Sequence, residues 1–253
     1  MKKIIALLLA VCMVFCFAAC GKNTDDADNK LVMATNAEFP PYEYHEGDEI
    51  VGIDAEIAAL IAEKLDMELE IADVDFDSII PGVQEGKYDM GMAGMTVTDE
   101  RLEKVAFSDT YAKGVQVVIV KEDGNIASLD DVEGKKIGVQ QGTTGDIYAS
   151  DSVENGGYGE ENVTKYANGA LAVEALKSDK VDCVIIDNEP AMAYVKANEG
   201  LKILDTEYAN EDYAICFAKE NTELQTKVND ALKELIADGS VQKVVDKYIK
   251  AEE

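Results

Sequence analysis

Short apolar strands alternate with amphipathic helices along most of this chain, and this order constrains the fold more than any other feature. The first series runs from a strand at 31–35 through a helix at 54–65 and a strand at 67–74 to a helix capped by Asp77 and a strand at 88–93. Such an order pairs strands in parallel and gathers ligand-binding loops at their carboxyl ends. The sequence therefore predicts an α/β fold with a binding site at that edge.

A second series of the same kind follows the first. It comprises a strand at 115–120, a short helix capped by Ser128, a strand at 136–140, a helix from about Asp146, a helix at 170–178 and a strand at 181–186. About 225 residues carry both series, which is enough for two small lobes or for one large α/β domain. Composition does not choose between these two arrangements.

Two further helices follow, and their apolar residues recur at core spacing. We expect Asn221 to cap the first, which ends at Gly239, and Ser240 to cap the second. Side chains three and four positions apart share one face of a helix. Both helices are therefore interpreted as packing elements without a binding role.

The N-terminus has the pattern of an export signal. Two lysines precede an apolar run that ends in Ala-Ala immediately before Cys20, so residues 1–19 are interpreted as a signal peptide. The cysteine resembles that of the bacterial lipoprotein box, in which it is acylated, although Phe17 stands where Leu is usual. Cleavage elsewhere, with Cys20 incidental, stays open. Residues 20–29 are polar and rich in Asp and Asn, so we expect a flexible tether.

The charge balance excludes some partners. The 51 acidic and 23 basic residues give the full chain a net charge of −28 at pH 7. Loss of Lys2 and Lys3 with the leader would take this value to −30. Anionic polymers and anionic lipids are poor partners for such a surface, so we expect no nucleic-acid binding.

Residues that bind metals or act as nucleophiles are sparse. His45 is the single histidine, and the chain has no close Cys/His cluster, so we expect no metal site, no catalytic residue and no cofactor. Cys183 and Cys216 lie in apolar, strand-like runs and are interpreted as buried small hydrophobic residues. A single disulfide between them stays open.

The segment at 91–101, Gly-Met-Ala-Gly-Met-Thr-Val-Thr-Asp-Glu-Arg, runs from a strand into a capped helix. Free backbone groups at the strand end, the hydroxyl of Thr96 and the guanidinium of Arg101 form a donor array suited to a carboxylate. The alternative is an ordinary strand-turn-helix with a surface arginine. Taken alone, the segment does not decide between the two.

Several separated motifs occur in an order shared with one protein family. From residue 31 onward, and in its leader, the chain resembles the polar amino-acid solute-binding proteins (family 3) of bacterial ABC importers, of the lipoprotein type. The matching stretches are Thr-Asn-Ala-Glu-Phe-Pro-Pro-Tyr-Glu-Tyr at 35–44, Gly-Ile-Asp at 52–54, Asp-Phe at 75–76, Ala-Gly-Met-Thr-Val-Thr-Asp-Glu-Arg at 93–101, Phe-Ser-Asp at 107–109, Gln-Gly-Thr-Thr at 141–144, and Asp187.

The resemblance implies a two-lobed periplasmic-binding-protein fold of type II. Each lobe is then a mostly parallel sheet flanked by helices, and two crossing segments near 111–115 and 208–213 form the hinge. The first lobe combines residues 30–111 with residues 211–253, and the second lobe spans 112–210. The first lobe is therefore expected to be discontinuous in sequence.

The resemblance also implies which residues meet a free amino acid. Arg101 holds the α-carboxylate together with Thr96 and the backbone at Thr144, while Asp187 and the carbonyl of Gly94 hold the ammonium. This division makes physical sense because either charge of a zwitterion is costly to desolvate without a partner.

The ligand-binding residues expected on the second lobe, Thr143, Thr144 and Asp187, also have simpler interpretations. Thr143 and Thr144 precede a helix, whose N-terminal amides favour an anion, but Thr143 also suits a plain N-cap. Asp187 on its own could cap a helix that begins before Pro190.

Aromatic residues are expected to flank the ligand. Phe39 and Phe76 match family positions that sandwich the aliphatic part of the ligand, which excludes water and strengthens charged contacts. Tyr42 is expected at the wall or rim. Asp54 is expected behind the site or at a helix cap, without ligand contact.

Two neutral amides bear on the ligand's side chain. Asn36 falls where relatives that select basic amino acids often have Asp, and Gln140 falls where glutamine-binding relatives have Lys. Both can donate and accept, so a polar or basic L-amino acid is favoured and an apolar one is not. Glu38 could pair with a cationic side chain or face solvent.

The resemblance implies a free L-amino acid as ligand and the permease and ATPase of an ABC importer as partners. We expect a monomer, held by lipid on Cys20 at the outer face of the cytoplasmic membrane, that captures its ligand by hinge closure. We predict that the chain is not an enzyme. The alternatives are a cyclohexadienyl dehydratase-like enzyme with Glu189 as general acid, or a sensing module that serves a separate receptor.

Overall fold

The structure is a computed structural model, and it describes residues 29–249. The predicted signal peptide, Cys20 and all but the last residue of the predicted tether lie outside the described residues. Within residues 29–249, no helix combines the length and the apolar character that a bilayer span requires.

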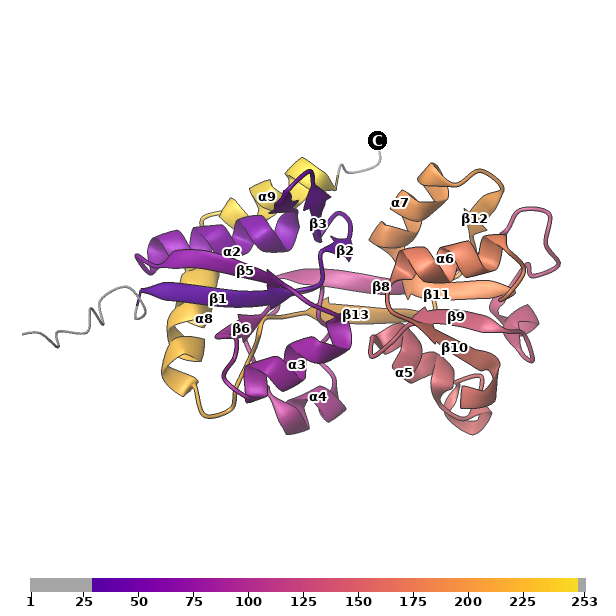
Figure 1. Ribbon diagram of the computed structural model, residues 1–253, viewed down its shortest axis with the longest axis horizontal. Coiled ribbons are helices and arrows are strands. Elements are labelled where there is room, and N and C mark those ends of the chain that lie inside the picture. Colours follow the sequence, from indigo (N-terminus) through magenta and orange to yellow (C-terminus); the bar gives the residue numbers. More distant parts are fainter. Residues whose placement is uncertain (1–28, 250–253) are drawn as a thin grey trace, which may run out of the picture. The chain divides into compact units, whose positions relative to one another are not determined.

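One group of elements is built on a five-stranded sheet (Figure 1). Its strands, in spatial order, are β5 (Glu68–Asp73), β1 (Lys30–Thr35), β6 (Met90–Gly91), β14 (Cys216–Phe217) and β7 (Ala106–Phe107). β1 and β6 run parallel, whereas β14 runs antiparallel to both of its neighbours. A strand from the last fifth of the chain thus lies inside the sheet that β1 begins.

Helices cover both faces of this sheet. They are α2 (Ile53–Lys64), α3 (Phe76–Gln84), α4 (Asp99–Lys104), α8 (Thr222–Ala237) and α9 (Ser240–Tyr248). Alternate residues of β1 face opposite ways: Leu31 and Met33 pack in the cluster with α2, α8 and α9, while Val32 and Ala34 pack in the cluster with α3. A small antiparallel sheet of β2 (Glu38–Phe39), β3 (Glu43–Glu46) and β4 (Glu49–Val51) adjoins α2.

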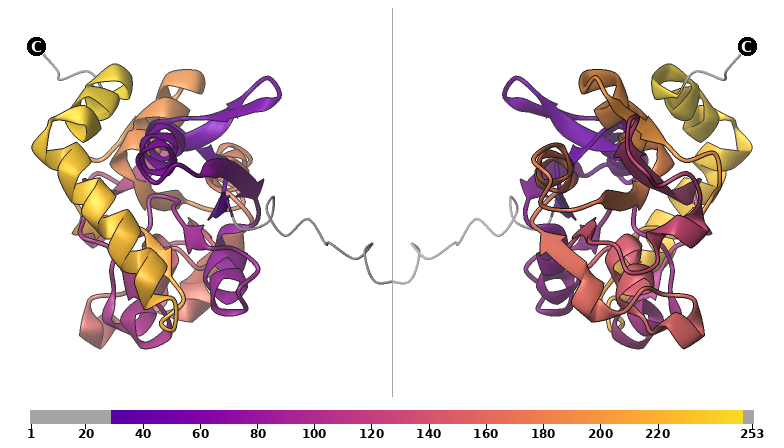
Figure 2. Two further views of the ribbon diagram at one scale, coloured as in Figure 1. Left: turned by 90° about the vertical axis from the view of Figure 1, so that its left-hand side faces the viewer. Right: turned by 90° about the vertical axis from the view of Figure 1, so that its right-hand side faces the viewer.

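The last two helices pack on the first group of elements. Figure 2 shows α8 and α9, in yellow, beside the N-terminal helix α2. Lys64 of α2 pairs with Glu234 of α8 at 2.8 Å, and Lys247 of α9 pairs with Glu56 of α2. These exposed pairs add little stability, so the shared apolar cluster holds the helices in place.

The second group is built on a sheet with the order β10-β9-β11-β8-β12, and β13 pairs with β8 off this path. Its strands are β8 (Ala112–Lys121), β9 (Ile137–Gln140), β10 (Val163–Tyr166), β11 (Cys183–Asp187), β12 (Leu201–Ile203) and β13 (Ala209–Tyr213). β9 runs parallel to β10 and β11, and β8 runs antiparallel to its three partners.

The second sheet also carries helices. They are α5 (Thr144–Ser150), α6 (Gly169–Lys177) and α7 (Asn188–Ala197), with short 3-10 helices at Leu129–Val132, Val153–Asn155 and Glu160–Asn162. Ser128 and Asp131 form a capping box at the first of these 3-10 helices, where the sequence predicted a short helix capped by Ser128.

Two strands cross between the groups. β8 and β13 pair antiparallel from Ala112 opposite Tyr213 to Gln116 opposite Ala209 (Figure 1). The segment around Val97 joins them, because its amide donates to the carbonyl of Asp212 at 3.1 Å. The predicted two-lobed α/β fold with a two-strand hinge is therefore confirmed, and both sheets are mixed because the crossing and returning strands run antiparallel.

Two predicted element starts are wrong. α3 begins at Phe76, so its N-cap position is Asp75, and Asp77 lies within the first turn. α9 begins at Ser240 itself, with Gly239 at the N-cap position in a left-handed conformation. Asn221 does occupy the N-cap position of α8, but its side chain makes no capping hydrogen bond. Acidic and small polar residues suit several positions of a first turn, so their identity does not fix the boundary.

Two predicted extents also differ. The strand expected at 88–93 keeps only Met90–Gly91 in the sheet, because the chain turns at Gly94, whose φ is +50°. α5 begins at Thr144 and not near Asp146, with Thr143 as its N-cap.

The two described cysteines are buried and free. Cys183 lies in β11 of the second sheet and Cys216 in β14 of the first. Burial raises the pKa of each thiol to about 12. The structure thus favours the interpretation as small hydrophobic residues over the disulfide.

Candidate functional site

One small cavity collects every predicted ligand-binding residue. It lies between the two groups of elements. Its lining consists of the ten predicted residues and two more: Asn36, Phe39, Phe76, Gly94, Thr96, Arg101, Gln140, Thr143, Thr144 and Asp187, with Glu43 and Ala93. Side chains from positions 36 to 187 therefore converge on one space.

The arginine turn aims a buried guanidinium at this cavity. The Thr98 hydroxyl accepts from the backbone amide of Arg101 and so caps α4. Arg101 is only 4% exposed, and its Nη1 and Nη2 donate to the carbonyl oxygens of Thr96 (2.7 Å) and Gly142 (3.1 Å). The guanidinium carbon lies 5.4 Å from the ring centre of Phe76. The alternative of a surface arginine is wrong.

Burial lowers the pKa of Arg101, and the charge of Glu211 is the largest effect opposing it. Arginine keeps its proton even so, because its ordinary pKa lies above 12. The guanidinium is bonded to neutral carbonyl oxygens, so its positive charge remains available to an anion in the cavity.

Asp187 supplies the opposite charge from the end of β11. Its carboxylate accepts from the Gln116 amide at 2.7 Å and from the Tyr213 hydroxyl. It stands at the N-cap position of α7 but makes no capping hydrogen bond, so the helix-cap alternative does not describe its side chain. Burial, followed by the charge of Glu211, raises the pKa of Asp187 to about 8.

The turn at Gly94 is fixed from behind by Asp54. The Asp54 carboxylate accepts from the Gly94 amide at 2.8 Å and from the Tyr111 hydroxyl at 2.9 Å. A Cβ atom at Gly94 would lie 3.0 Å from the Phe39 ring, and φ at this position is positive, so glycine is required there. Asp54 itself does not line the cavity.

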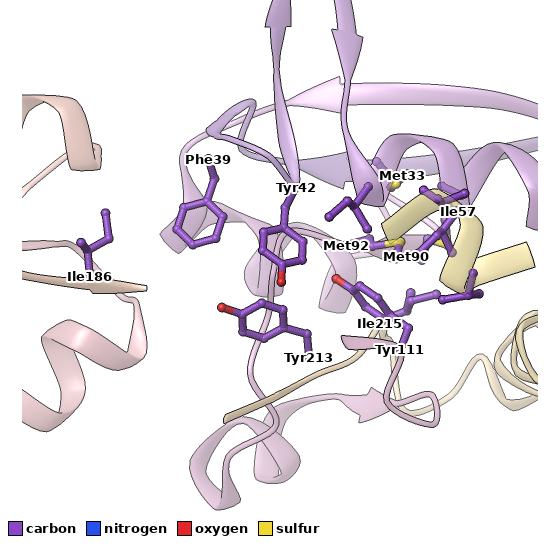
Figure 3. Close-up of a cluster of buried hydrophobic side chains, with 14 of the residues drawn as sticks. Met33, Phe39, Tyr42, Ile57, Met90, Met92, Tyr111, Ile186, Tyr213 and Ile215 are labelled. Carbon is purple, nitrogen blue, oxygen red and sulfur yellow. The ribbon is translucent and has the colours of Figure 1, made fainter. Parts of the chain in front are cut away.

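Aromatic side chains form one side of the site. Figure 3 shows Phe39, Tyr42 and Tyr213 side by side, with the Tyr213 hydroxyl directed toward the strand that carries Ile186. Tyr42 packs edge-on against Tyr213, with ring centres 5.2 Å apart, and lies 6.0 Å from Phe39. Tyr42 is buried behind Phe39 and does not line the cavity.

Polar side chains from the two groups meet at the opposite wall. The Gln140 amide donates to the Asn36 carbonyl oxygen at 2.8 Å, and the Asn36 amide donates to the backbone of Val74 at 3.0 Å. Gln141 reaches Asp77 at 2.5 Å. These contacts join the two groups across the cavity. Glu38 is exposed and is not part of the lining.

The start of α5 completes the lining. The Thr143 hydroxyl accepts from the Asp146 amide at 3.4 Å, as an N-cap does, and donates to the carbonyl of Gln140 at 2.9 Å. Thr144 is the first helical residue and is buried. Thr143 thus combines the capping role with a place on the cavity.

Glu43 is a cavity residue that the sequence analysis missed. It is 1% exposed, and neither carboxyl oxygen receives a hydrogen bond from a donor among the described residues. Burial, and then the charge of Asp54, raise its pKa well above the usual range. A signal was available: a tight hairpin pairs Phe39 with Glu43, and paired residues share a face.

Two hinge residues behind Asp187 were also missed. Gln116 of β8 and Glu211 of β13 are buried, and the Gln116 amide donates to a Glu211 oxygen at 3.1 Å. The Thr96 hydroxyl donates to the same oxygen at 3.0 Å. No local pattern marks these two residues, because strand pairing between distant segments creates their burial.

The matches with known proteins agree with this geometry. The model for the bacterial extracellular solute-binding proteins, family 3, matches residues 31–251. The chain belongs to this family. It is 36% identical over 258 residues to the arginine-binding extracellular protein ArtP of Bacillus subtilis (strain 168), with 100% of both chains covered.

Solved structures show the same likeness to family members. An ancestral arginine-binding protein bound to arginine is 40% identical, with a TM-score of 0.80 and coverage of 87% of this chain and 98% of that one. An ancestral arginine-binding protein bound to glutamine is also 40% identical, with a TM-score of 0.81 and coverage of 88% and 99%. Family membership makes this chain an extracellular solute-binding protein and not an enzyme, as the sequence predicted.

Proposed function

We propose that this chain captures a basic L-amino acid, arginine above all, and delivers it to an ABC importer. The observation that carries the proposal is the charge pattern of one buried cavity: the guanidinium of Arg101, the carboxyl of Asp187 and the carboxyl of Glu43 all line it. Arginine carries the three matching charges, one negative and two positive. Each buried charge of the protein then gains a partner of opposite sign.

The α-carboxylate and the α-ammonium of the ligand bind at the two charged ends of the cavity, Arg101 and Asp187. Arg101 forms a forked contact with the carboxylate, supported by Thr96 and by the backbone at Thr144. Asp187 and the carbonyl of Gly94 accept from the ammonium. Phe39 and Phe76 enclose the aliphatic stem of the ligand and keep water away from both contacts.

The side-chain guanidinium lies beside Glu43, Asn36 and Gln140. Glu43 has two buried oxygens without a donor among the described residues, and a guanidinium supplies two donors in a fork. Its positive charge also favours the ionised form of Glu43. Asn36 and Gln140 offer carbonyl oxygens as further acceptors.

The relatives support this ligand class. ArtP is an arginine-binding protein, and the ancestral protein was solved with arginine and with glutamine. Glutamine shares the α-groups of arginine but lacks the side-chain charge. Comparison of the two ligands therefore isolates the contribution of Glu43.

Capture requires the two lobes to close. We assign residues 30–111 and 211–253 to the first lobe and residues 112–210 to the second. Arg101 belongs to one and Asp187 to the other, so neither lobe alone satisfies both ends of the ligand. Closure around the ligand gives a permease a surface that distinguishes loaded from empty protein.

We infer that the leader directs the domain to a membrane surface. Cleavage before Cys20 and acylation of its thiol would anchor the chain at the outer face of the cytoplasmic membrane, with residues 20–29 as a tether. Mass spectrometry of the membrane fraction tests this step, because a Cys20→Ser variant would lose the lipid and leave the membrane.

A thermal-shift and calorimetry screen against the common amino acids tests the proposed ligand. Binding to the folded state alone raises the melting temperature, so arginine is expected to give the largest shift, followed by other basic amino acids and glutamine. The Arg101→Ala variant serves as the control without binding. The proposal fails if no amino acid stabilises the protein, or if apolar amino acids do so best.

A further inference from the structure

A second carboxyl group lies beside Asp187 at the base of the cavity. Glu211 is 5% exposed and belongs to the hinge strand β13, opposite Gly114 of β8. One of its oxygens accepts from Thr96 and Gln116, and the other has no donor among the described residues. Glu211 does not line the cavity, but it adjoins two residues that do.

Glu211 lies between the two lobes and is near both Arg101 and Asp187. Thr96 belongs to the same turn as Arg101, and Gln116 uses one amide nitrogen to reach both Glu211 and Asp187. The two carboxyl groups therefore lie close together, since the same nitrogen is 2.7 Å from an Asp187 oxygen and 3.1 Å from a Glu211 oxygen. Two adjacent buried carboxyl groups favour a shared proton, because two ionised carboxylates repel each other and offer only acceptors.

Charged and titratable side chains from several elements face the pair formed by Asp187 and Glu211. Arg101 of α4 attracts Glu211, and Tyr148 of α5 lies close enough for burial and then the charge of Glu211 to raise the pKa of its hydroxyl. Tyr213 of β13 donates to Asp187. The more distant Tyr42 and Glu43 feel the charge of Asp187. One cation and several neutral hydroxyls therefore surround two carboxyl groups, and this balance favours one negative charge over two.

We propose that Asp187 and Glu211 share a single proton, and that the α-ammonium of a captured amino acid takes the place of that proton. The proposal rests on the proposed function. On binding, the proton leaves for the solvent, the pair changes from one negative charge to two, and the ammonium keeps its three hydrogens and its charge. Both carboxylates then bond to the ammonium or to the donors already in place.

Release of this proton makes capture depend on pH. The pKa of Asp187 is raised to about 8, first by burial and then by the charge of Glu211, so the proton is held at neutral pH. Each unit of pH below about 8 is then expected to weaken binding by about tenfold, by linkage. A ligand held by a permanently ionised carboxylate would show no such slope.

Titration calorimetry of the mature protein counts the released protons. Glutamine is titrated at pH 7 in two buffers of different ionisation enthalpy, because its uncharged side chain leaves Glu43 unperturbed. We expect about one proton released per glutamine bound, from the linkage of a single site. Arginine is then expected to release at least as many.

Three variants assign the proton to this pair. Glu211→Gln removes one carboxyl and is expected to reduce the release and to make the dependence of the dissociation constant on pH from 6 to 8 shallower. Asp212→Asn removes the same charge at the exposed neighbouring position and is expected to behave as the wild type. Glu43→Gln is expected to keep the release for glutamine.

The outcomes separate this inference from the proposed function. Tight amino-acid binding without proton release by the wild type would overturn the shared proton and leave the function intact. The same result follows if Glu211→Gln releases as many protons as the wild type. If Glu211→Gln fails to fold, the two-buffer measurement on the wild type still decides. Absence of amino-acid binding by the wild type refutes the function itself.

Discussion

The two charged poles of the cavity are held in different ways. Arg101 donates to two backbone carbonyl oxygens, which are neutral, and the nearest opposing carboxyl belongs to the hinge. Asp187 accepts from side-chain donors but lies beside Glu211, which resists its ionisation. Arg101 is thus fully charged without a ligand, whereas we expect Asp187 to become fully ionised only beside a cation. One pole is a fixed anchor and the other responds to its partner.

Loss of the fixed anchor should have the largest effect. Arg101→Ala leaves the ligand carboxylate buried without a partner, which costs about 3 to 5 kcal/mol, or roughly 150-fold to 5,000-fold in affinity. Calorimetry with arginine measures the change. Lys104→Ala, at an exposed site on the same helix, is the matched control and should bind normally. Near-normal affinity of Arg101→Ala would remove the assignment of the carboxylate pole.

Loss of the Asp187 charge should weaken binding somewhat less than loss of Arg101, and it should stabilise the unliganded protein. Asp187→Asn keeps an acceptor for the ammonium but no charge, so we expect a loss of about tenfold to several hundredfold. The unliganded fold should become more stable, by about 2 to 4 °C in melting temperature per kcal/mol of relieved burial. Asp205→Asn, at an exposed position, controls for net charge. A lower melting temperature for Asp187→Asn would contradict the contrast between the poles.

The side-chain end should affect selectivity more than overall affinity. Glu43→Gln removes the partner of the ligand's guanidinium, so arginine binding should fall by about tenfold or more, while glutamine binding should change by less than about threefold. Competition between the two ligands gives the ratio directly. Glu46→Gln, exposed on the same strand, should keep the wild-type ratio. Equal losses for both ligands would place Glu43 in a general packing role.

The smallest expected effect is the pH dependence of the unliganded fold. Burial raises the pKa of Asp54 to about 6 and that of Asp187 to about 8, against about 4 in unfolded chains. Between pH 4 and 8 the folded state therefore binds more protons than the unfolded state, and stability falls as pH rises. Melting temperatures from pH 5 to 8 in Asp187→Asn should decline less steeply than in the wild type. Parallel curves would show that Asp187 is ionised throughout.

The same contrast explains how far the sequence could predict the site. The sequence indicated Arg101 because its turn, its cap and the start of its helix lie within eleven consecutive residues. The sequence also indicated Thr143, Thr144 and Asp187, because these residues follow recognisable strands and strand ends gather at one edge of a sheet. The order of strands and helices predicted two α/β series, and only the resemblance to a family implied that they form two lobes. These features depend on local periodicity and on chain order.

Two of the missed residues, Gln116 and Glu211, depend on long-range contacts. Glu211 lies 115 positions from Thr96, with which it shares a hydrogen bond, and Gln116 lies 71 positions from Asp187. Before the hinge strands pair, Gln116 and Glu211 look like any polar residue of an exposed strand. Helix starts failed for a different reason, since Asp75 and Asp77 both suit the first turn of α3 and only packing chose between them.

The position of β14 sets an order of assembly. Residues 216–217 fill the gap between β6 and β7, and α8 and α9 then cover one side of the same sheet. The β8–β12 sheet is contiguous in sequence and can be completed while synthesis continues, but the other sheet stays divided until its late strand emerges. The half that bears Arg101 therefore matures only when nearly the whole chain is available.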